Sequence, residues 1–517
     1  MPIRTLKCTV PLLVISATAA LADEDAALIE AAGRGDVALV GAMLDTGADV
    51  NGTAVDGTTA LHWAVRGAHR DLAELLIRTG ASAAAEDRYG VTPLHLAAVN
   101  GSAALIAALL DAGADPNATA PTGETALMTA TRTGTTDAMA LLIERGASVD
   151  AREPTFEQTA LMLAVRENHP AAVAVLIAHG ADIDAQTRIG PTPEFSPPCK
   201  GTGCGSEGVG INRGGLPDRG RRAATRGGMT PLLYAARDGR LDATRLLVDA
   251  GASLELAEAN GITPLLMATL NNQLEIARLL LERGANVNVD DFWGRTPLFA
   301  AVEYRNLDMN NRDQDSPADN GVDRGPILDF IGELLERGAE VNARTRDVPP
   351  SRRWLYSLGD VSWVDLTGQT PFLRAALSGD TAAMRLLLDH GADPNLPASA
   401  GTTPLMAAAG MNWVVAQTYT VSNAALLEAV ALCLELGADI NATNSMGLTA
   451  LLGAANRGSN EIIEFLVANG ARLDVADVEG RTPIRWAEGV FLAAVGAEHK
   501  PATIALIEKL IAAEQPQ

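Results

Sequence analysis

A short motif recurs at a nearly constant spacing along the chain, and this repetition limits the possible folds more than any other feature. A Thr-x-Leu-like triplet begins at eleven positions, and uninterrupted neighbours lie 33 residues apart, with one gap of 34. The triplets begin at Thr59, Thr92, Thr125, Thr159, Thr230, Thr263, Thr296, Thr370, Thr403, Thr449 and Thr482. A Gly-Ala pair closes each unit. Because one such unit cannot bury its own apolar face, we expect the units to stack into an elongated array.

The fullest copy of the motif, residues 87–117, gives each repeated residue a physical role. Thr92 can cap a helix through its hydroxyl, and Pro93 fits the first helical position, where no amide hydrogen is needed. Leu94 and the small alanines that follow face neighbouring helices. Gly113 is expected to end the second helix in a left-handed conformation, and Asp87–Gly90 to form the tip of a β-hairpin turn.

The stretch Asp87-Arg88-Tyr89-Gly90-Val91-Thr92-Pro93-Leu94-His95-Leu96-Ala97-Ala98 closely resembles the ankyrin repeat, and the resemblance covers nearly all of residues 26–513. It implies a mainly α-helical solenoid of about twelve helix–turn–helix units with β-hairpin tips. We assign residues 23–55 to an N-terminal capping repeat, 56–481 to ankyrin repeats, and 482–517 to a C-terminal capping repeat and tail. The resemblance also implies protein binding through the hairpin tips and the concave helix face.

The first 22 residues have the pattern of a signal peptide. Arg4 and Lys7 form a basic start, Val10–Ala20 is an apolar run, and Ala20-Leu21-Ala22 places small residues at a cleavage site. The apolar run is too short to span a bilayer comfortably, and no later run is long and apolar enough for a membrane helix. We therefore expect a mature chain that begins at Asp23 and is periplasmic or secreted.

Composition narrows the choice of partner. Hydrophobic residues make up 47% of the chain but aromatic residues only 4%, which suits closely packed helices. The formal net charge of −23 argues against a nucleic-acid partner, because phosphate binding needs clustered lysine and arginine. We expect a monomer that binds a protein of unknown identity.

Four insertions interrupt the repeat period, and insertions in repeat proteins often lie at the binding face. Their surplus residues lie near 186–227, 307–324, 345–366 and 411–422. Tryptophan, tyrosine and arginine dominate binding hot spots, and the aromatic residues concentrate in the second half of the chain, where the last two insertions lie. The candidate partner-binding residues are Arg352, Arg353, Trp354, Tyr356, Trp363, Trp413 and Tyr419. The alternative is that these rings only pin the insertions onto the solenoid.

The remaining candidate chemistry has simpler explanations. Cys199 and Cys204 are expected to form a local disulfide in an oxidising compartment, since no further ligand lies nearby to complete a zinc site. The glycine pattern at 203–208 lacks the strand and helix of a dinucleotide site. The acidic run at 308–323 hints at calcium but lacks the loop glycine and closing glutamate, so a solvated loop is the alternative.

No catalytic, cofactor or metal site is predicted. Six of the seven histidines occupy repeated positions, for example His62 and His95, so a structural role explains them. The leading hypothesis is a non-catalytic protein-binding scaffold outside the cytoplasm. The alternatives are an accessory subunit of a periplasmic enzyme or cell-wall complex and, less favoured, an enzyme with its chemistry in the insertions. If the aromatic insertions do not bind, the arginine-rich loop at 213–226 is the next candidate.

Overall fold

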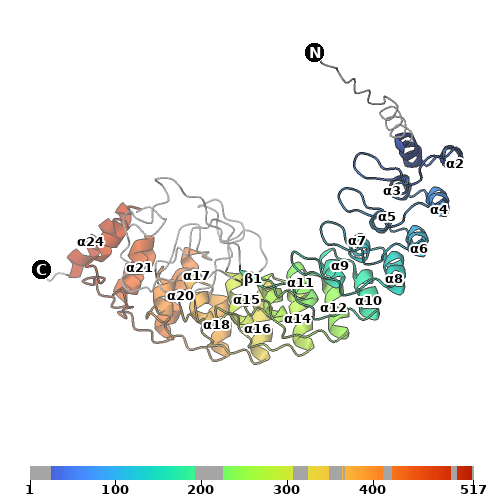
Figure 1. Cartoon of the computed structure of the whole chain (residues 1–517). Coiled ribbons are helices and arrows are strands. Elements are labelled where there is room, and N and C mark those ends of the chain that lie inside the picture. The colour runs from blue at the N-terminus through green and yellow to red at the C-terminus, as the bar shows by residue number, and fades with distance from the viewer. Residues whose placement is uncertain are drawn as a thin grey trace, which may run out of the picture. The chain divides into compact units, whose positions relative to one another are not determined.

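The computed structural model describes residues 25–191, 225–306, 324–347, 364, 367–411, 422–490 and 498–514. The chain divides into two compact units, and each is described by itself. Unit 1 comprises residues 1–189 and 227–253, and unit 2 comprises residues 190–226 and 254–517. Helix pairs joined by loops build both units (Figure 1).

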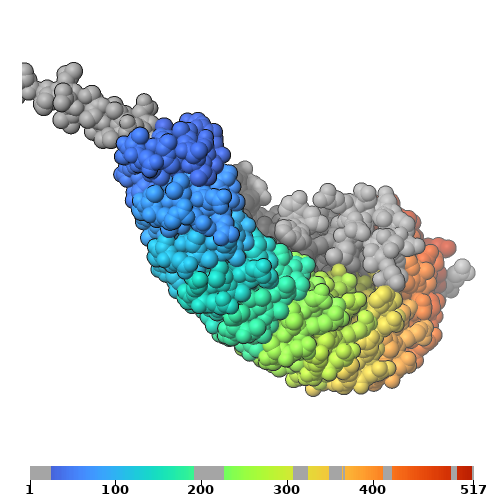
Figure 2. All heavy atoms as spheres, turned by 90° about the vertical axis from the view of Figure 1, so that its right-hand side faces the viewer, coloured from blue at the N-terminus to red at the C-terminus, as the bar shows by residue number. Residues whose placement is uncertain are grey.

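Unit 1 contains six helix pairs in its described residues. They are a helix over 25–34 with α2 (Val37–Asp45), α3 (Ala60–Arg66) with α4 (Arg70–Arg78), α5 (Pro93–Val99) with α6 (Ala103–Asp111), α7 (Ala126–Thr133) with α8 (Thr136–Glu144), α9 (Ala160–Arg166) with α10 (Pro170–Ala178), and α11 (Pro231–Asp238) with α12 (Leu241–Asp249). From α3 onward, each first helix packs on the next first helix, and each second helix on the next second helix. Figure 2 shows these repeats packed one on the next, from blue to green.

Unit 2 contains a further six helix pairs in its described residues. They are α13 (Pro264–Leu270) with α14 (Leu274–Glu282), α15 (Pro297–Arg305) with α16 (Gly325–Glu336), α17 (Pro371–Ser378) with α18 (Thr381–Asp389), α19 (Pro404–Ala408) with α20 (Asn423–Glu435), α21 (Ala450–Arg457) with α22 (Asn460–Ala468), and α23 (Pro483–Ala487) with α24 (Pro501–Glu514). Unit 2 also holds the short antiparallel strands β1 (Gly190–Pro191) and β2 (Thr225–Arg226). The prediction of about twelve units is confirmed over the described residues.

A threonine caps the first helix of every pair from α3 to α23, as the repeated triplet predicts. In the fullest copy, Thr92 has extended backbone angles and its hydroxyl accepts a hydrogen bond from the backbone N–H of His95. The buried Leu94, Ala97 and Ala98 then pack into the core, each at most 1% exposed. Gly113 follows α6 with a φ of +88°, which is the left-handed conformation that the sequence predicts.

The loops between pairs are held mainly by side-chain carboxylates rather than by strand pairing. The carboxylate of Asp87 accepts hydrogen bonds from the backbone N–H groups of Tyr89 and Val91, at 2.8 and 2.9 Å. Because a carboxylate takes these donors, the predicted β-hairpins are reduced, within the described residues, to β1 with β2 and two isolated bridges. Neighbouring loops are also linked, since the N–H of Arg88 donates to the carbonyl of Asp56 at 2.8 Å.

A second set of bonds joins neighbouring repeats just after their second helices end. The side-chain amide of Asn117 donates to the carbonyl of Gly146 at 3.0 Å, and its oxygen accepts from the N–H of Ser148 at 2.7 Å. Asn51 and Asn441 make the same pair of bonds to their neighbouring repeats. Each asparagine thus satisfies backbone groups at the end of the next helix pair.

The predicted insertions leave the helix stacking intact. In unit 1 the chain departs and returns at one place, because the N–H of Thr187 donates to the carbonyl of Met229 at 3.1 Å. Gly227 lies at this junction with a φ of +105°, and a Cβ there would meet the carbonyl oxygen of Arg188 at 1.8 Å. In unit 2, α15 still packs on α16 and α19 on α20, across the segments 307–323 and 412–421.

Shortening a core side chain in a central repeat is expected to destabilise the fold locally. Leu265 in α13 is 1% exposed, so Leu265→Ala should lower the free energy of unfolding by about 2–5 kcal/mol. Because coupling is mainly between neighbours, urea denaturation of this variant should resolve into two transitions. Val478→Ala is the control, since Val478 is 70% exposed. Equal stability of both variants and the parent chain would contradict the core assignment.

Candidate interaction surface

Large apolar side chains are exposed in the loops that precede the first helices of unit 1, three of them in turns and Ile189 next to β1. These side chains are Val55, Tyr89, Phe156 and Ile189, called here the loop-tip row, and all four are more than half exposed. Val99, at the end of α5, is also 54% exposed. Elsewhere in the described part of unit 1, only Val37 and Leu39 on α2 are large, apolar and exposed. Because these side chains lie on loops of one helix stack, they are candidates for an interaction surface.

Arginines occupy one repeated position on the first helices of unit 1. They are Arg66, Arg132, Arg166 and Arg237, called here the arginine row, and each lies seven residues after its capping threonine. The residue three positions earlier lies on the same helix face and is aromatic in two repeats. The guanidinium of Arg66 stacks 5.3 Å from the ring centroid of Trp63, and that of Arg237 lies 4.9 Å from the centroid of Tyr234.

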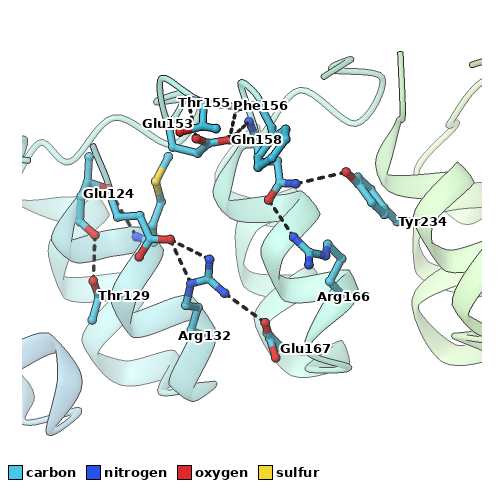
Figure 3. A network of polar contacts seen from close by, with 12 residues as sticks. Glu124, Thr129, Arg132, Glu153, Thr155, Phe156, Gln158, Arg166, Glu167 and Tyr234 are labelled. Atoms are coloured by element: carbon cyan, nitrogen blue, oxygen red, sulfur yellow. Dashed lines mark hydrogen bonds and ion pairs between the residues drawn. The ribbon is translucent and has the colours of Figure 1, made fainter. Parts of the chain in front are cut away.

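Hydrogen bonds hold the middle of this face together (Figure 3). Arg132 bonds to the Glu124 carboxylate at 2.6 Å and to Glu167 at 3.1 Å, which ties the loop before α7 to the end of α9. The hydrogen bond to Glu124 raises the pKa of Arg132. The Gln158 amide donates to the Tyr234 hydroxyl at 3.2 Å and accepts from Arg166 at 2.8 Å. Arg132 is therefore neutralised, whereas Arg166 is held by a neutral group.

The loop that carries Phe156 is fixed by a buried carboxylate. Glu153 is 7% exposed, and its two oxygens accept hydrogen bonds from the backbone N–H groups of Thr155, Phe156 and Gln158 at 2.7–3.1 Å. Glu157 has a φ of +59°, a conformation that this turn imposes. The loop is therefore ordered, and it keeps the Phe156 side chain exposed to solvent in the folded chain.

Two histidines position the loops on either side of this surface. Thr92 donates its backbone N–H to His95 Nδ1 at 3.3 Å, so Nδ1 carries no hydrogen and Nε2 donates to the Glu124 carbonyl at 3.3 Å. His62 makes the same bonds to Thr59 and to the Val91 carbonyl. Desolvation lowers the pKa of both histidines. They are therefore structural links between a helix cap and the next loop.

The sequence-predicted binding residues lie outside the described residues. Arg352, Arg353, Trp354, Tyr356 and Trp363 belong to the segment 348–363, and Trp413 and Tyr419 to 412–421. Two further predictions also concern residues outside the described ones. These are the disulfide between Cys199 and Cys204 and calcium binding by the acidic run at 308–323, and both stay predictions. Cys433 lies within the described residues: it is fully buried in α20, and burial raises the pKa of its thiol to about 12, so it is an inert core thiol.

Sequence reasoning missed the arginine row and the loop-tip row, although a signal for the arginine row was present. Aligning the repeats on their capping threonines places an arginine in the same column in four of the five first helices from α3 to α11. The same column in unit 2 holds Leu270, Glu303 and Leu377 in its first three repeats, and both leucines are buried.

Two arginines in unit 2 pair with buried carboxylates. The guanidinium of Arg295, 4% exposed, lies 2.7 Å from the fully buried carboxylate of Asp291. Arg305 lies 2.7 Å from Asp380, which is 3% exposed. Since each partner satisfies the other, these pairs serve the packing of their repeats. In the described stretches of the chain, no group of three His, Cys, Asp or Glu side chains is placed to hold a metal ion.

Comparison with known proteins identifies the repeat. The family model for ankyrin repeats (3 copies) matches residues 28–120, 117–187, 232–311, 349–417 and 418–490, which is well over half of the chain. The chain belongs to the ankyrin-repeat family. Osteoclast-stimulating factor 1 from Bos taurus is 46% identical over 52 residues, which is 10% of this chain and 24% of that protein's length.

Among solved structures, the human ASB11 ankyrin repeat domain is similar to this chain. The match has 24% sequence identity and a TM-score of 0.39, and it covers 50% of this chain and 98% of that domain. Ankyrin repeats are a protein-interaction module and are typically non-catalytic, so this ankyrin chain is a protein-binding scaffold. None of the described helices is both long and apolar enough to cross a membrane.

The buried histidines are expected to make stability depend on pH. Since their pKa is lowered in the folded state, the unfolded chain binds more protons below about pH 6.5. The contribution of the two neutral histidines to the free energy of unfolding is therefore complete above that pH. It declines as the pH falls through 6.5 toward their lowered folded-state pKa values. Urea denaturation should show lower stability at pH 5.5 than at pH 7.5.

The variant H62M/H95M should reduce this difference, because other repeats carry Met128 and Met162 at the same position. His179→Gln is the control, since His179 is exposed on the surface. If the variant lost as much stability between the two pH values as the parent chain, the histidines would not be responsible.

Proposed function

We propose that this ankyrin chain is a non-catalytic scaffold that acts outside the cytoplasm and binds a protein through the loop-tip row and the first-helix face of unit 1, together with the inserted loops. The observation that carries the proposal is the placement of Val55, Tyr89, Phe156 and Ile189, more than half exposed, at loop tips of one stack. An isolated globular protein gains nothing by displaying aromatic side chains on ordered loops. A partner that covers these side chains would gain binding free energy from their burial.

The geometry of the loops supports binding without large rearrangement. The carboxylates of Asp87 and Glu153 fix their loops from within, and adjacent loops share backbone hydrogen bonds. A surface that is ordered before binding loses little conformational entropy when the partner docks. This favours a scaffold over an enzyme, whose chemistry would need converging acid, base or nucleophilic groups.

The inserted loops form the second part of the proposal. Trp354, Tyr356 and Trp413 are large aromatic residues within insertions of unit 2, and such residues supply binding energy at low entropic cost. An accessory subunit that docks on a periplasmic enzyme or cell-wall complex would use the same mechanism and differ only in its partner. The two alternatives are distinguished by the identity of the captured protein.

Truncating one exposed aromatic side chain of the loop-tip row should strongly weaken binding of the partner while leaving the fold intact. With the mature chain as bait in extracytoplasmic extract, Tyr89→Ala and Phe156→Ala should each reduce recovery of the bound partner about thirtyfold. Trp354→Ala should do the same if the insertion takes part. Val37→Ala is the control, because Val37 is exposed on α2 away from the loop tips. Unchanged recovery with Tyr89→Ala and Phe156→Ala would place the binding surface elsewhere.

Export is the part of the proposal that rests on the N-terminal sequence. Arg4, Lys7, the apolar run and Ala20-Leu21-Ala22 support cleavage after Ala22. N-terminal sequencing of the protein from its source cells should therefore find Asp23 first, in the extracytoplasmic fraction. A cytoplasmic protein that retains Met1 would refute export and leave the binding surface unaffected.

A further inference from the structure

We propose that the first-helix face of unit 1 selects an extended, acidic segment of its partner, whose carboxylates bind the arginine row while apolar side chains pack on the loop-tip row. The inference rests on the proposed function and adds the chemistry of the partner. It concerns Arg66 and Arg166 above all, because among the described residues neither forms an ion pair with a carboxylate.

The charge of this face is opposite to that of the chain. The formal net charge of the whole chain is −23. From each capping threonine to the eighth residue after it, the five first helices α3, α5, α7, α9 and α11 carry four arginines against two carboxylates, Glu167 and Asp238. Within the row, Arg132 and Arg237 already pair with carboxylates, so Arg66 and Arg166 are the two members left to attract a partner's carboxylates at short range.

Stacking prepares the arginines for such a ligand. Arg66 lies over the ring of Trp63 at 5.3 Å, and Arg166 lies 5.7 Å from the ring centroid of Tyr234. Stacking uses the flat face of a guanidinium and leaves its N–H groups pointing outward in the plane, where they can bind a carboxylate with two hydrogen bonds. The rings also restrict the arginine side chains, which reduces the entropy lost on binding.

The spacing of the repeats suits an extended chain. Neighbouring packed helices lie about 8–10 Å apart. A chain in the polyproline II conformation advances about 3.1 Å per residue with three residues per turn, so every third residue returns to the same side about 9.3 Å further on. An extended segment with this period could therefore place one carboxylate near Arg66 of α3 and another near Arg166 of α9, three repeats further on, with apolar residues near the loops between them.

The same observations disfavour a nucleic acid. Glu124 and Glu167 flank Arg132 at 2.6 and 3.1 Å, so a continuous line of phosphates would meet carboxylates as well as arginines. The exposed rings of Tyr89 and Phe156 lie at separate loop tips, where an apolar peptide side chain can pack on each.

A defined peptide tests the proposal on the full mature chain. The probe is a fluorescein-labelled peptide of about five Leu-Pro-Glu triplets, chosen for the three-residue period, and binding is measured by fluorescence anisotropy at low and moderate salt. We expect saturable binding that weakens as salt rises. The charge-reversal variant R66E/R166E should bind at least about tenfold more weakly.

The matched control is R78E/R245E, which makes the same charge change at two exposed arginines of the second helices α4 and α12. It should bind as the parent chain does, and circular dichroism and thermal melting should show that both variants are folded. A peptide of Leu-Pro-Lys triplets should not bind. Moving all the glutamates to one end of the peptide should weaken binding.

Failure of the acidic peptide to bind, equal binding of the lysine peptide, or unchanged affinity of R66E/R166E would each overturn the proposal. So would a dimer of the parent chain, seen by sedimentation equilibrium and abolished by R66E/R166E, because a second copy would then occupy the face. If the peptide fails while Tyr89→Ala and Phe156→Ala still lose the captured protein, the proposed function stands and this inference alone is wrong.

Discussion

Each helix pair buries its apolar face only against the pairs before and after it, and this nearest-neighbour packing determines which residues are free to vary. Positions such as Leu94, Ala97 and Ala98 are fixed because they lie between stacked helices. Capping threonines, asparagines such as Asn117 and histidines such as His95 are fixed because they satisfy backbone groups at the junctions. The loop tips and the outward positions of the first helices remain, and these are the positions that we propose bind the partner.

Much of the fold could be predicted because those fixed positions repeat. The Thr-Pro pair, the alanines and the closing glycines each have one physical role, so their recurrence at 33 residues indicated the helices, their caps and the number of units. The carboxylates that replace strand pairing in the loops were harder to foresee. An aspartate such as Asp87 is equally typical of a turn that closes a β-hairpin and of a turn whose backbone N–H groups bond to the aspartate carboxylate.

The interaction surface was less predictable, for a related reason. Packing does not constrain exposed residues, so Val55, Tyr89 and Phe156 differ from one repeat to the next and leave no periodic pattern. The arginine row does repeat, but arginine at the end of a short helix also serves the helix dipole. Only the structure shows that Arg66 and Arg166 stack on rings without a carboxylate partner in the described part of the chain.

Hydrogen–deuterium exchange on the complex with the captured partner tests the central claim most directly. The backbone amides of the loops over residues 53–59, 86–92 and 153–159 should exchange more slowly in the complex than in the free chain, while those of the second helices α4, α6 and α8 should not change. Protection confined to unit 2, or to the second helices of unit 1, would contradict the assignment of binding to the loop tips and first helices of unit 1.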